Sequence, residues 1–366
     1  MAQILTFLGK GGTGRTTVAI ATAKAFAAHG KQVLLIGQGS DPSLSLLLET
    51  PLEGEAPQTV TANLQVIQLR ATQLLEQNWQ ILKQLETQYL QTPFFKSVFG
   101  QELGVLPGMD QALTLNALRE YDSTGQYDVI VLDSDGDQNT LRMLGMPEIL
   151  GWYVRRFRQV FAESDLGKTL APFAGPIAGA VLNVSWSGNV LDQPAVSQMN
   201  NILEQGQAAI ADPARIAAYL ITTDSPLAIA TARQLWGTAQ QVGLTVGGVL
   251  LNQSDDLPPV STSFAPLAVT PLPTIQFNDW QPLIAALPDF TSALSAPRPI
   301  TVDLATRQVS LFLPGFDKTQ VKLCQSGPEV TIEAGDQRRN LLLPPELRGQ
   351  AVTGAKFQDS HLILSF

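Results

Sequence analysis

Residues 9–17 read Gly-Lys-Gly-Gly-Thr-Gly-Arg-Thr-Thr, so glycines, hydroxyl groups and cations are gathered in one short segment. Glycines allow successive backbone N–H groups to converge on phosphate oxygens, and the amino end of a following helix adds its dipole. The pattern therefore predicts a loop that binds the phosphates of a ligand, with a glycine-rich turn that binds nothing as the alternative. The residues expected to contact the ligand are Gly11, Gly12, Thr13, Gly14, Arg15, Thr16 and Thr17.

Two side chains of this loop indicate which ligand it binds. Thr16 stands at the hydroxyl position of the pattern GxxxxGK[ST], where the side chain ligates the Mg²⁺ that accompanies ATP. Arg15 occupies the lysine position of that pattern. Its planar guanidinium keeps the charge but is larger than an ammonium group, so we expect it to lie alongside the phosphates. The sequence thus predicts ATP, with Mg²⁺, as the ligand.

The elements around the loop support this prediction. An apolar run at residues 4–8 precedes it, and an alanine-rich helical pattern follows and ends at Gly30. Short apolar runs then alternate with helix-length segments, which predicts a doubly wound α/β fold with a mostly parallel sheet covered on both faces. Residues 74–99 and 140–170 are amphipathic and are expected to form helical insertions. The predicted strands are 4–8, 33–36, 66–69, 129–132, 178–184, 216–221 and 248–251.

The pattern changes near residues 288–300, where prolines and small residues predict a linker. Short apolar runs separated by turns follow it, without helical periodicity, and these predict a small all-β sandwich. We therefore expect two domains, a P-loop ATPase domain at residues 1–290 and a β-sandwich at residues 300–366.

Residues 1–290 resemble the family of arsenite-pump ATPases and tail-anchored-protein targeting ATPases. These proteins carry a deviant loop in which a lysine precedes Gly-Gly-x-Gly, and Lys10 matches that lysine. The resemblance implies that Lys10 reaches the nucleotide of the partner subunit in a homodimer; a solvated loop lysine is the alternative. Asp41, in the segment GSDPSLSL, matches the first switch, where the aspartate orients or activates the attacking water. The alternative is that Asp-Pro merely forms a turn.

Two later segments extend the resemblance. The strand VIVLD ends on Asp133, whose carboxylate would face the phosphate loop and hold a Mg²⁺-bound water. The segment GGVLLNQ resembles a late strand of the family, which implies that Asn252 and, less directly, Gln253 bind the adenine.

The second switch departs from the family. Residues 133–138 read Asp-Ser-Asp-Gly-Asp-Gln, whereas the family has Asp-Thr-Ala-Pro-Thr-Gly. Gln138 replaces the glycine that would contact the γ-phosphate, and two extra carboxylates repel a triphosphate unless a cation intervenes. Together with Arg15, these changes predict slow hydrolysis of ATP.

Cysteine and histidine are too scarce for several kinds of site. The chain has one cysteine, Cys324, and two histidines, His29 and His361, that stand far apart. A single thiol excludes an intramolecular disulfide, the CxxC with which the targeting ATPase holds zinc between subunits, and the thiols with which the pump binds metalloid. We therefore expect a homodimer without zinc and no arsenite transport by that chemistry.

Residues 300–366 resemble the α-crystallin domain of small heat-shock proteins, and an unrelated β-sandwich is the alternative. This resemblance implies contacts with protein rather than new chemistry. It is carried by Leu-Pro-Gly-Phe at 313–316, by strands at 321–324 and 330–333, by the strand at 339–344, and by the apolar triplet at 362–364.

Two segments carry apolar stripes at helical spacing. In the family, helices from these regions build a groove for an apolar helix of a client protein, but ordinary core packing gives the same pattern. Both interpretations stay open here. The residues concerned are Leu75, Trp79, Leu82 and Tyr89 in the first segment and Trp152, Tyr153, Phe157, Val160 and Phe161 in the second.

The amino-acid composition and net charge argue against several classes of protein. The chain has 366 residues, of which 45% are hydrophobic and 15% charged, which is typical of well-cored globular domains. Its net charge of -9 argues against binding to nucleic acid or to anionic lipid, both of which need clustered cations. No apolar run is long enough to span a membrane, so we expect a soluble, cytoplasmic protein.

We interpret the sequence as a dimeric, ATP-controlled chaperone or targeting factor for hydrophobic protein segments. In this interpretation ATP and Mg²⁺ draw two subunits together through Lys10, Asp41 and the switch at Asp133, and this changes a client groove. The alternative is a nucleotide-sensing regulatory protein, degenerate in hydrolysis, that binds no apolar client.

Overall fold

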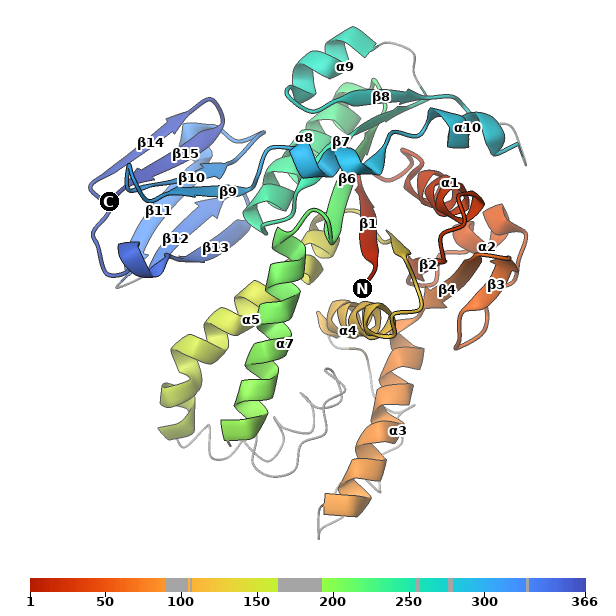
Figure 1. Ribbon diagram of the computed structural model, residues 1–366, viewed down its shortest axis with the longest axis horizontal. Helices are drawn as coiled ribbons and strands as arrows, with labels where there is room; N and C mark the ends of the chain where they lie inside the picture. Colours follow the sequence, from red (N-terminus) through yellow and green to blue (C-terminus); the bar gives the residue numbers. More distant parts are fainter. Residues whose placement is uncertain (90–104, 106, 164–192, 254–256, 276–278, 327–328) are drawn as a thin grey trace.

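The computed structural model describes residues 1–89, 105, 107–163, 193–253, 257–275, 279–326 and 329–366. An eight-stranded sheet in the order β3-β4-β2-β5-β1-β6-β7-β8 forms its centre (Figure 1). Neighbouring strands are parallel except β3, which runs antiparallel to β4 at one edge. The strands are β1 (Gln3–Leu8), β2 (Val33–Gln38), β3 (Gln58–Thr61), β4 (Leu64–Leu69), β5 (Val129–Asp133), β6 (Ile216–Thr222), β7 (Val246–Asn252) and β8 (Val269–Leu272).

The predicted doubly wound sheet is confirmed. Six of the seven predicted strands form, and the seventh, at residues 178–184, lies outside the described residues. The prediction missed the two edge strands. β3 is polar and short, and β8 contains Pro271, so neither shows the apolar run that marks a strand buried on both faces.

Helices cover both faces of the sheet because alternate residues of each central strand point to opposite sides. On β1, Ile4 and Leu8 belong to one buried core, whereas Leu5 and Phe7 belong to another. Helices α4, α5, α7, α8 and α9 pack on the first core, and α1, α2, α10 and η3 pack on the second. The helices are α1 (Arg15–Ala28), α2 (Ser43–Leu48), α3 (Ala71–Tyr89), α4 (Met109–Ser123), α5 (Gln138–Glu163), α7 (Gln193–Ala211), α8 (Pro226–Gln241), α9 (Leu257–Phe264), α10 (Gln281–Ala286) and the 3₁₀ helix η3 (Phe290–Ser295).

The two predicted helical insertions correspond to α3 and α5 as far as the structure describes them. On α3, Leu75 and Trp79 are buried. On α5, Trp152 is partly buried and Tyr153 is 51% exposed. The side chains of Leu82, Tyr89, Phe157, Val160 and Phe161 lie outside the described residues. Within the described parts of the chain, no helix combines the length and apolar character needed to cross a membrane.

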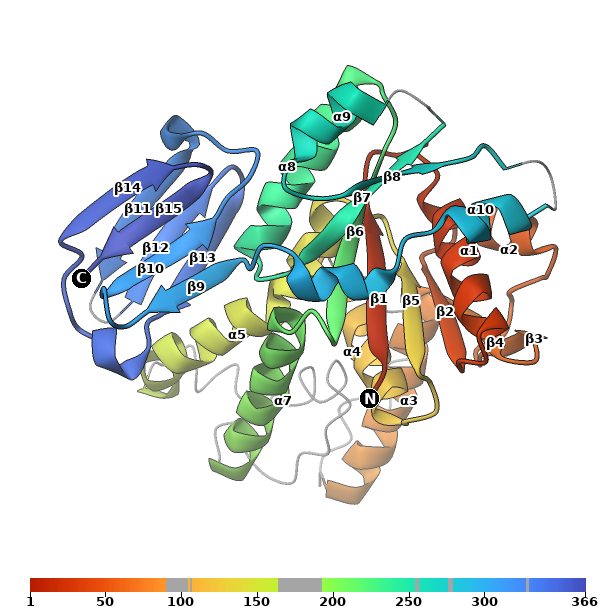
Figure 2. The ribbon, with the colours of Figure 1, turned by 45° about the horizontal axis from the view of Figure 1, so that its top comes forward.

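The C-terminal strands form two antiparallel sheets that enclose a core of their own, as the sequence predicted. One sheet has the order β14-β15-β10-β9 and the other the order β11-β12-β13. Figures 1 and 2 show this β-sandwich at one side of the molecule, beside α5 and α8. Its strands are β9 (Ile300–Asp303), β10 (Gln308–Phe312), β11 (Val321–Ser326), β12 (Glu329–Ala334), β13 (Gln337–Leu342), β14 (Gly354–Gln358) and β15 (His361–Ser365).

The segment expected to be a linker packs on the central sheet over its first half. Phe290 begins η3 and is 6% exposed, and its ring lies 4.8 Å from that of Tyr219 on β6. The hydroxyl of Tyr219 also donates to the carbonyl oxygen of Phe290 at 2.8 Å. The prolines and small residues of this segment predicted an irregular linker. The packing of one buried aromatic ring, which composition does not indicate, fixes its first half on the sheet.

Candidate functional site

The glycine-rich loop connects β1 to α1 at the carboxyl end of the sheet, and its shape depends on glycine. Gly14 caps α1 with a φ of 93°, in the left-handed region. A Cβ atom at this position would lie 2.3 Å from the side-chain nitrogen of Asn252. That nitrogen, at the end of β7, donates to the carbonyl oxygen of Thr13 at 2.8 Å. The loop is therefore held by a strand far along the chain, and any side chain at residue 14 would displace it.

Contacts among its own residues and with β6 also fix the conformation of the loop. The side chain of Thr13 is buried and donates to the carbonyl oxygen of Lys10 at 2.8 Å. Gly9 lies so close to β6 that an added Cβ would stand 2.3 Å from the carbonyl oxygen of Ile221. Gly12 has a φ of 84°, which a residue with a side chain rarely adopts. Thr13 therefore stabilises the loop rather than facing outward.

Arg15 joins the loop to the second switch. Its guanidinium donates to the carbonyl oxygen of Gly9 at 2.9 Å. Gly136 of the switch packs against it, because a Cβ there would lie 2.7 Å from the Arg15 side chain and 2.5 Å from the carbonyl oxygen of Phe7. The N–H of Gly9 also donates to the carbonyl oxygen of Gly136 at 2.9 Å. The guanidinium thus contacts both the loop and the second switch.

The structure brings together Thr16 and Asp133, the two residues expected to hold Mg²⁺. The Thr16 hydroxyl donates to a carboxylate oxygen of Asp133 at 3.3 Å. Burial raises the pKa of Asp133 to about 6, while the Thr16 hydrogen bond and the charge of Arg15 act in the opposite direction. One hydroxyl and one carboxylate, next to a loop suited to phosphates, are the oxygen ligands that Mg²⁺ takes at nucleotide sites. The residues present therefore fit the ion.

The first switch lies beside Asp133. Gly37, on the strand that leads into this switch, pairs with Asp133 on β5, and the charge of Asp41 contributes to the raised pKa of Asp133. Hydrogen bonds from Ser43, including one from its N–H at 2.7 Å, lower the pKa of Asp41. Gln68 on β4 donates to the carbonyl oxygens of Gly39 and Asp41, at 3.1 and 2.7 Å, and holds this turn. The predictions did not include Gln68, whose position in a buried strand was the only signal.

The extra acids of the second switch have separate roles. Asp137 caps α5, because its carboxylate accepts from the N–H of Asn139 at 2.7 Å. An acidic residue directly before a helix is a signal for such a cap that the sequence already contained. Asp135 is exposed; partial desolvation of its carboxylate and the charge of Asp137 raise its pKa, and the charge of Arg15 lowers it. One of the two carboxylates therefore serves the helix and the other faces the loop cation.

The remaining predicted residues surround the loop. Lys10 and Gly11 are exposed, and Thr17 is partly buried in the first turn of α1. Asn252 is 8% exposed and bound to the loop, whereas Gln253 is exposed and has a φ of 59°. A hollow of about 420 Å³ opens beside Lys10 and Gly11. It is lined by Gly9, Lys10, Gly11 and Arg15 of the loop, Asp135, Asp137 and Gln138 of the second switch, and Thr231, Gln234 and Leu235 of α8.

Comparison with known proteins agrees with this geometry. Residues 2–262, which include the loop and both switches, match the family described as anion-transporting ATPases. The chain belongs to the anion-transporting ATPase family. Residues 305–366 match the domain described as an HSP20-like domain found in ArsA. Both resemblances inferred from the sequence, to an ATPase family and to the small heat-shock protein domain, are confirmed.

Relatives of this family member align along its whole length or along part of it. A putative arsenical pump-driving ATPase of Prosthecochloris vibrioformis is 25% identical over 398 residues, which cover 100% of this chain and 96% of that protein. A protein of the same description from Aquifex aeolicus is 19% identical over 402 residues, covering 99% of each. An ATPase ASNA1 homolog of Paramecium tetraurelia is 27% identical over 144 residues, covering 39% of this chain and 43% of its own.

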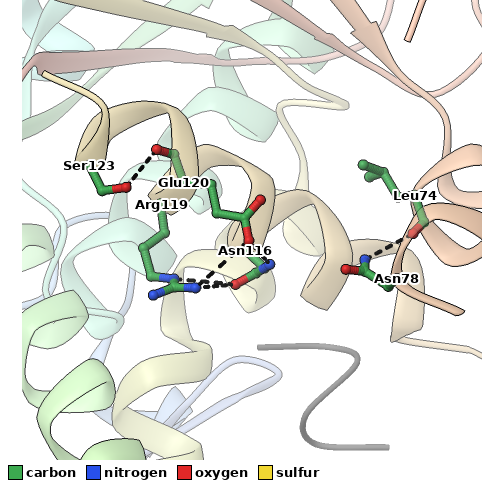
Figure 3. Close-up of polar contacts among 6 residues, drawn as sticks. All are labelled: Leu74, Asn78, Asn116, Arg119, Glu120 and Ser123. Carbon is green, nitrogen blue, oxygen red and sulfur yellow. Dashed lines mark hydrogen bonds and ion pairs between the residues drawn. The ribbon is translucent and has the colours of Figure 1, made fainter. Parts of the chain in front are cut away.

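A second cavity lies at the opposite end of the sheet. It measures about 470 Å³ and is lined mainly by apolar side chains of α4, α5 and α7 around the start of β1 and β6. On α4, which forms one wall, the buried Asn116 accepts from Arg119 at 2.8 Å and donates to Glu120 at 3.0 Å (Figure 3). Among its apolar lining residues are Leu115, Leu118, Met146, Pro147, Leu150, Ile202 and Leu203.

Proposed function

We propose that this family member binds ATP with Mg²⁺, hydrolyses it slowly, and uses it as a homodimer to control the binding of hydrophobic protein segments. One observation carries the proposal. Helix α5 begins at Gln138, beside the phosphate loop, and its residues Met146 and Leu150 line the apolar cavity at the other end of the sheet. The nucleotide site and the cavity thus share one helix, through which a change at one site can reach the other.

At the nucleotide, each residue has one task. Backbone N–H groups of the loop and the amino end of α1 bind the phosphates, and Arg15 lies beside them. Thr16 and Asp133 would hold Mg²⁺, which would screen the negative charge of the phosphates. Asp41 orients the attacking water as an ionised hydrogen-bond acceptor; because hydrogen bonds from Ser43 lower the pKa of its carboxyl, it is a weak base and positions the water rather than taking its proton.

Two predicted contacts complete the nucleotide site. Asn252 and Gln253 stand at the carboxyl end of β7, where the adenine of a nucleotide on this loop is expected to lie. Lys10 is exposed at the mouth of the loop, as a residue that reaches the nucleotide of a second subunit must be. Dimer formation would therefore depend on ATP.

The apolar cavity supports a client with an apolar helix. Its described walls come from three helices, and Leu150 is 43% exposed at its edge, so a second apolar surface can cover residues that water now contacts. A helix laid into a groove of this kind binds through side chains spaced three and four residues apart. A movement of α5 changes the shape of this wall.

The proposal is tested by coexpressing the full chain with a tagged apolar helix of about 20 residues, the length that spans a membrane. We expect the helix to copurify with the chain and to be released when ATP is added. Light scattering should show a dimer, and phosphate release should be measurable but slow. A chain that is monomeric with and without ATP, or that binds no nucleotide by calorimetry, would contradict the proposal.

The second candidate, a nucleotide-sensing regulatory protein, is favoured by the second switch. Gln138 replaces a glycine there, and Asp135 places a carboxylate near the phosphate loop. Such a protein would bind ATP tightly, hydrolyse almost none of it, and retain no apolar helix in the same copurification.

A further inference from the structure

The β-sandwich is bound along the helix that leaves the second switch. The amide of Gln337 on β13 donates to the side-chain oxygen of Gln138 at 3.3 Å, and Asp336 pairs with Arg142. Further along α5, Arg339 binds Glu148 at 3.1 Å. Near the end of this run, the indole N–H of Trp152 donates to Glu329 of β12 at 2.6 Å.

These four positions of α5 fall on one face. Arg142, Glu148 and Trp152 follow Gln138 by 4, 10 and 14 residues. At 100° per residue the four side chains lie within about 120° of one another, and they follow roughly 21 Å of helix. The Arg339–Glu148 pair is shielded from water, since its side chains are only 12% and 15% exposed. The β-sandwich therefore contacts the switch helix over its first four turns.

The same β-sandwich is anchored to α8, which packs on the central sheet. Gly237 of α8 lies so close to it that a Cβ there would stand 2.2 Å from the carbonyl oxygen of Pro314 and 2.5 Å from Phe316. The rings of Trp236 and Phe312 pack edge to face at 5.4 Å. Between its two anchors the β-sandwich joins α5, the helix that leaves the second switch, to α8.

Gln138 is the point at which these contacts reach the nucleotide site. It lines the hollow beside the phosphate loop, and its side-chain amide makes two hydrogen bonds. Its nitrogen donates to the Thr238 hydroxyl of α8 at 3.2 Å, and its oxygen accepts from Gln337 of the β-sandwich. For Gln138 to move toward a bound γ-phosphate, it must release both partners.

We propose that the β-sandwich is a brake on the second switch, and that Gln337 is a positioning residue that acts on ATP turnover by holding Gln138 against α8. This inference rests on the proposed function, since it concerns the hydrolysis step of the same site. The brake slows the step that follows binding and leaves binding itself unchanged, because Gln337 lies outside the hollow that the loop lines. It gives the C-terminal domain a function within the ATPase cycle.

The test compares Gln337→Ala with Gln325→Ala in the full chain. Gln325 is a glutamine of the same β-sandwich whose amide bonds Gln350 and Val352 within that domain, so it is a matched control. We expect Gln337→Ala to raise kcat by about threefold to tenfold, the range for one neutral hydrogen bond, with the Kd for ATP within about twofold. Gln325→Ala should leave both constants unchanged.

A second readout does not need hydrolysis. Hydrogen exchange at the amides of residues 138–152 should be faster in Gln337→Ala than in the wild type when ADP or a non-hydrolysable ATP analogue is bound, and Gln325→Ala should match the wild type. An unchanged or lower kcat in Gln337→Ala, together with unchanged exchange, would overturn the brake. If the wild type binds ATP but releases no phosphate, the hydrolysis in the proposed function fails, and the exchange comparison alone decides whether the β-sandwich holds α5.

Discussion

The phosphate loop and the apolar cavity, at the two ends of the central sheet, differ in what forms their surfaces. At the carboxyl end, the phosphate loop is shaped by backbone contacts and by two glycines, Gly9 and Gly14, at which a Cβ atom would lie 2.3 Å from a neighbouring atom. At the amino end, the cavity is lined by apolar side chains of three helices, and residues such as Leu150 remain partly exposed. The loop is held in one conformation, whereas an apolar lining selects for no single sequence; under the proposed function, that difference suits a site with varied apolar clients.

The largest effect that this comparison predicts is at Gly14. Gly14→Val introduces a side chain at a φ of 93° and drives its Cβ into the Asn252 amide. We expect ATP affinity to fall by more than about 100-fold, which is roughly 2.7 kcal/mol, as measured by calorimetry. Affinity within a few-fold of the wild type would show that the loop does not bind the nucleotide.

The control for that variant is Gly30→Val. Gly30 follows α1 with a φ of 78°, but no atom lies within 4 Å of an added Cβ. The backbone strain costs on the order of 1 kcal/mol of folding stability, and ATP affinity should stay unchanged. The pair separates the loss of a phosphate site from the general effect of a side chain in the left-handed region.

The next effect is expected at the apolar end. Leu150→Asp places a charge at the edge of the cavity, and because Leu150 is 43% exposed the fold should be retained. Affinity for an apolar helical peptide should fall about tenfold, or roughly 1.4 kcal/mol, while the Kd for ATP is unchanged. The matched control is Leu294→Asp, since Leu294 is 51% exposed and is not part of the cavity lining. Equal peptide binding by all three proteins would place the client surface elsewhere.

A smaller effect is predicted for Asn252→Ala, which removes the hydrogen bond to the Thr13 carbonyl. Loss of one hydrogen bond, at about 1 kcal/mol, should weaken ATP binding about fivefold. Because we also expect Asn252 to contact adenine, GTP should lose less affinity than ATP in a parallel titration. An equal loss for both nucleotides would restrict Asn252 to holding the loop.

The smallest effect is predicted for Arg15→Lys, which restores the usual residue of the loop. Lysine cannot keep the contacts of the guanidinium with Gly9 and Gly136, but its compact ammonium fits beneath the phosphates. Turnover measured by phosphate release should stay equal or rise by a few-fold, on the scale of about 1 kcal/mol. A steep loss of turnover would identify Arg15 as a residue adapted to catalysis here.

Local patterns in the sequence were sufficient to predict the fold and the position of the loop. Buried strands such as β1 and β2 are apolar runs, and the glycine pattern before α1 stands between a strand and a helix. Edge strands lack such runs, and this is why β3 and β8 were missed. The aspartate that ends β5 was also predicted, because a carboxylate after a buried strand reaches the loop end of a parallel sheet.

The contacts that could not be predicted join residues far apart in the chain. Gln337 meets Gln138 across 199 positions, and Asn252 meets Thr13 across 239. No pattern in a single sequence states which polar side chains will pair over such distances. For the same reason Gln138 could be identified as a departure from the family, but not as a partner of the β-sandwich.

The hydrogen bond between Asn252 and Thr13 joins two residues that a ribosome adds far apart in time. A ribosome adds residue 13 early and residue 252 only 239 positions later, which at about 5–20 residues per second takes on the order of ten to fifty seconds. Throughout that interval the nascent chain carries the glycine segment without the strand that fixes it. Until β7 joins the sheet the loop lacks this hydrogen bond, so the affinity of the nascent chain for ATP reaches its full value only late in synthesis, by about the fivefold factor expected for Asn252→Ala.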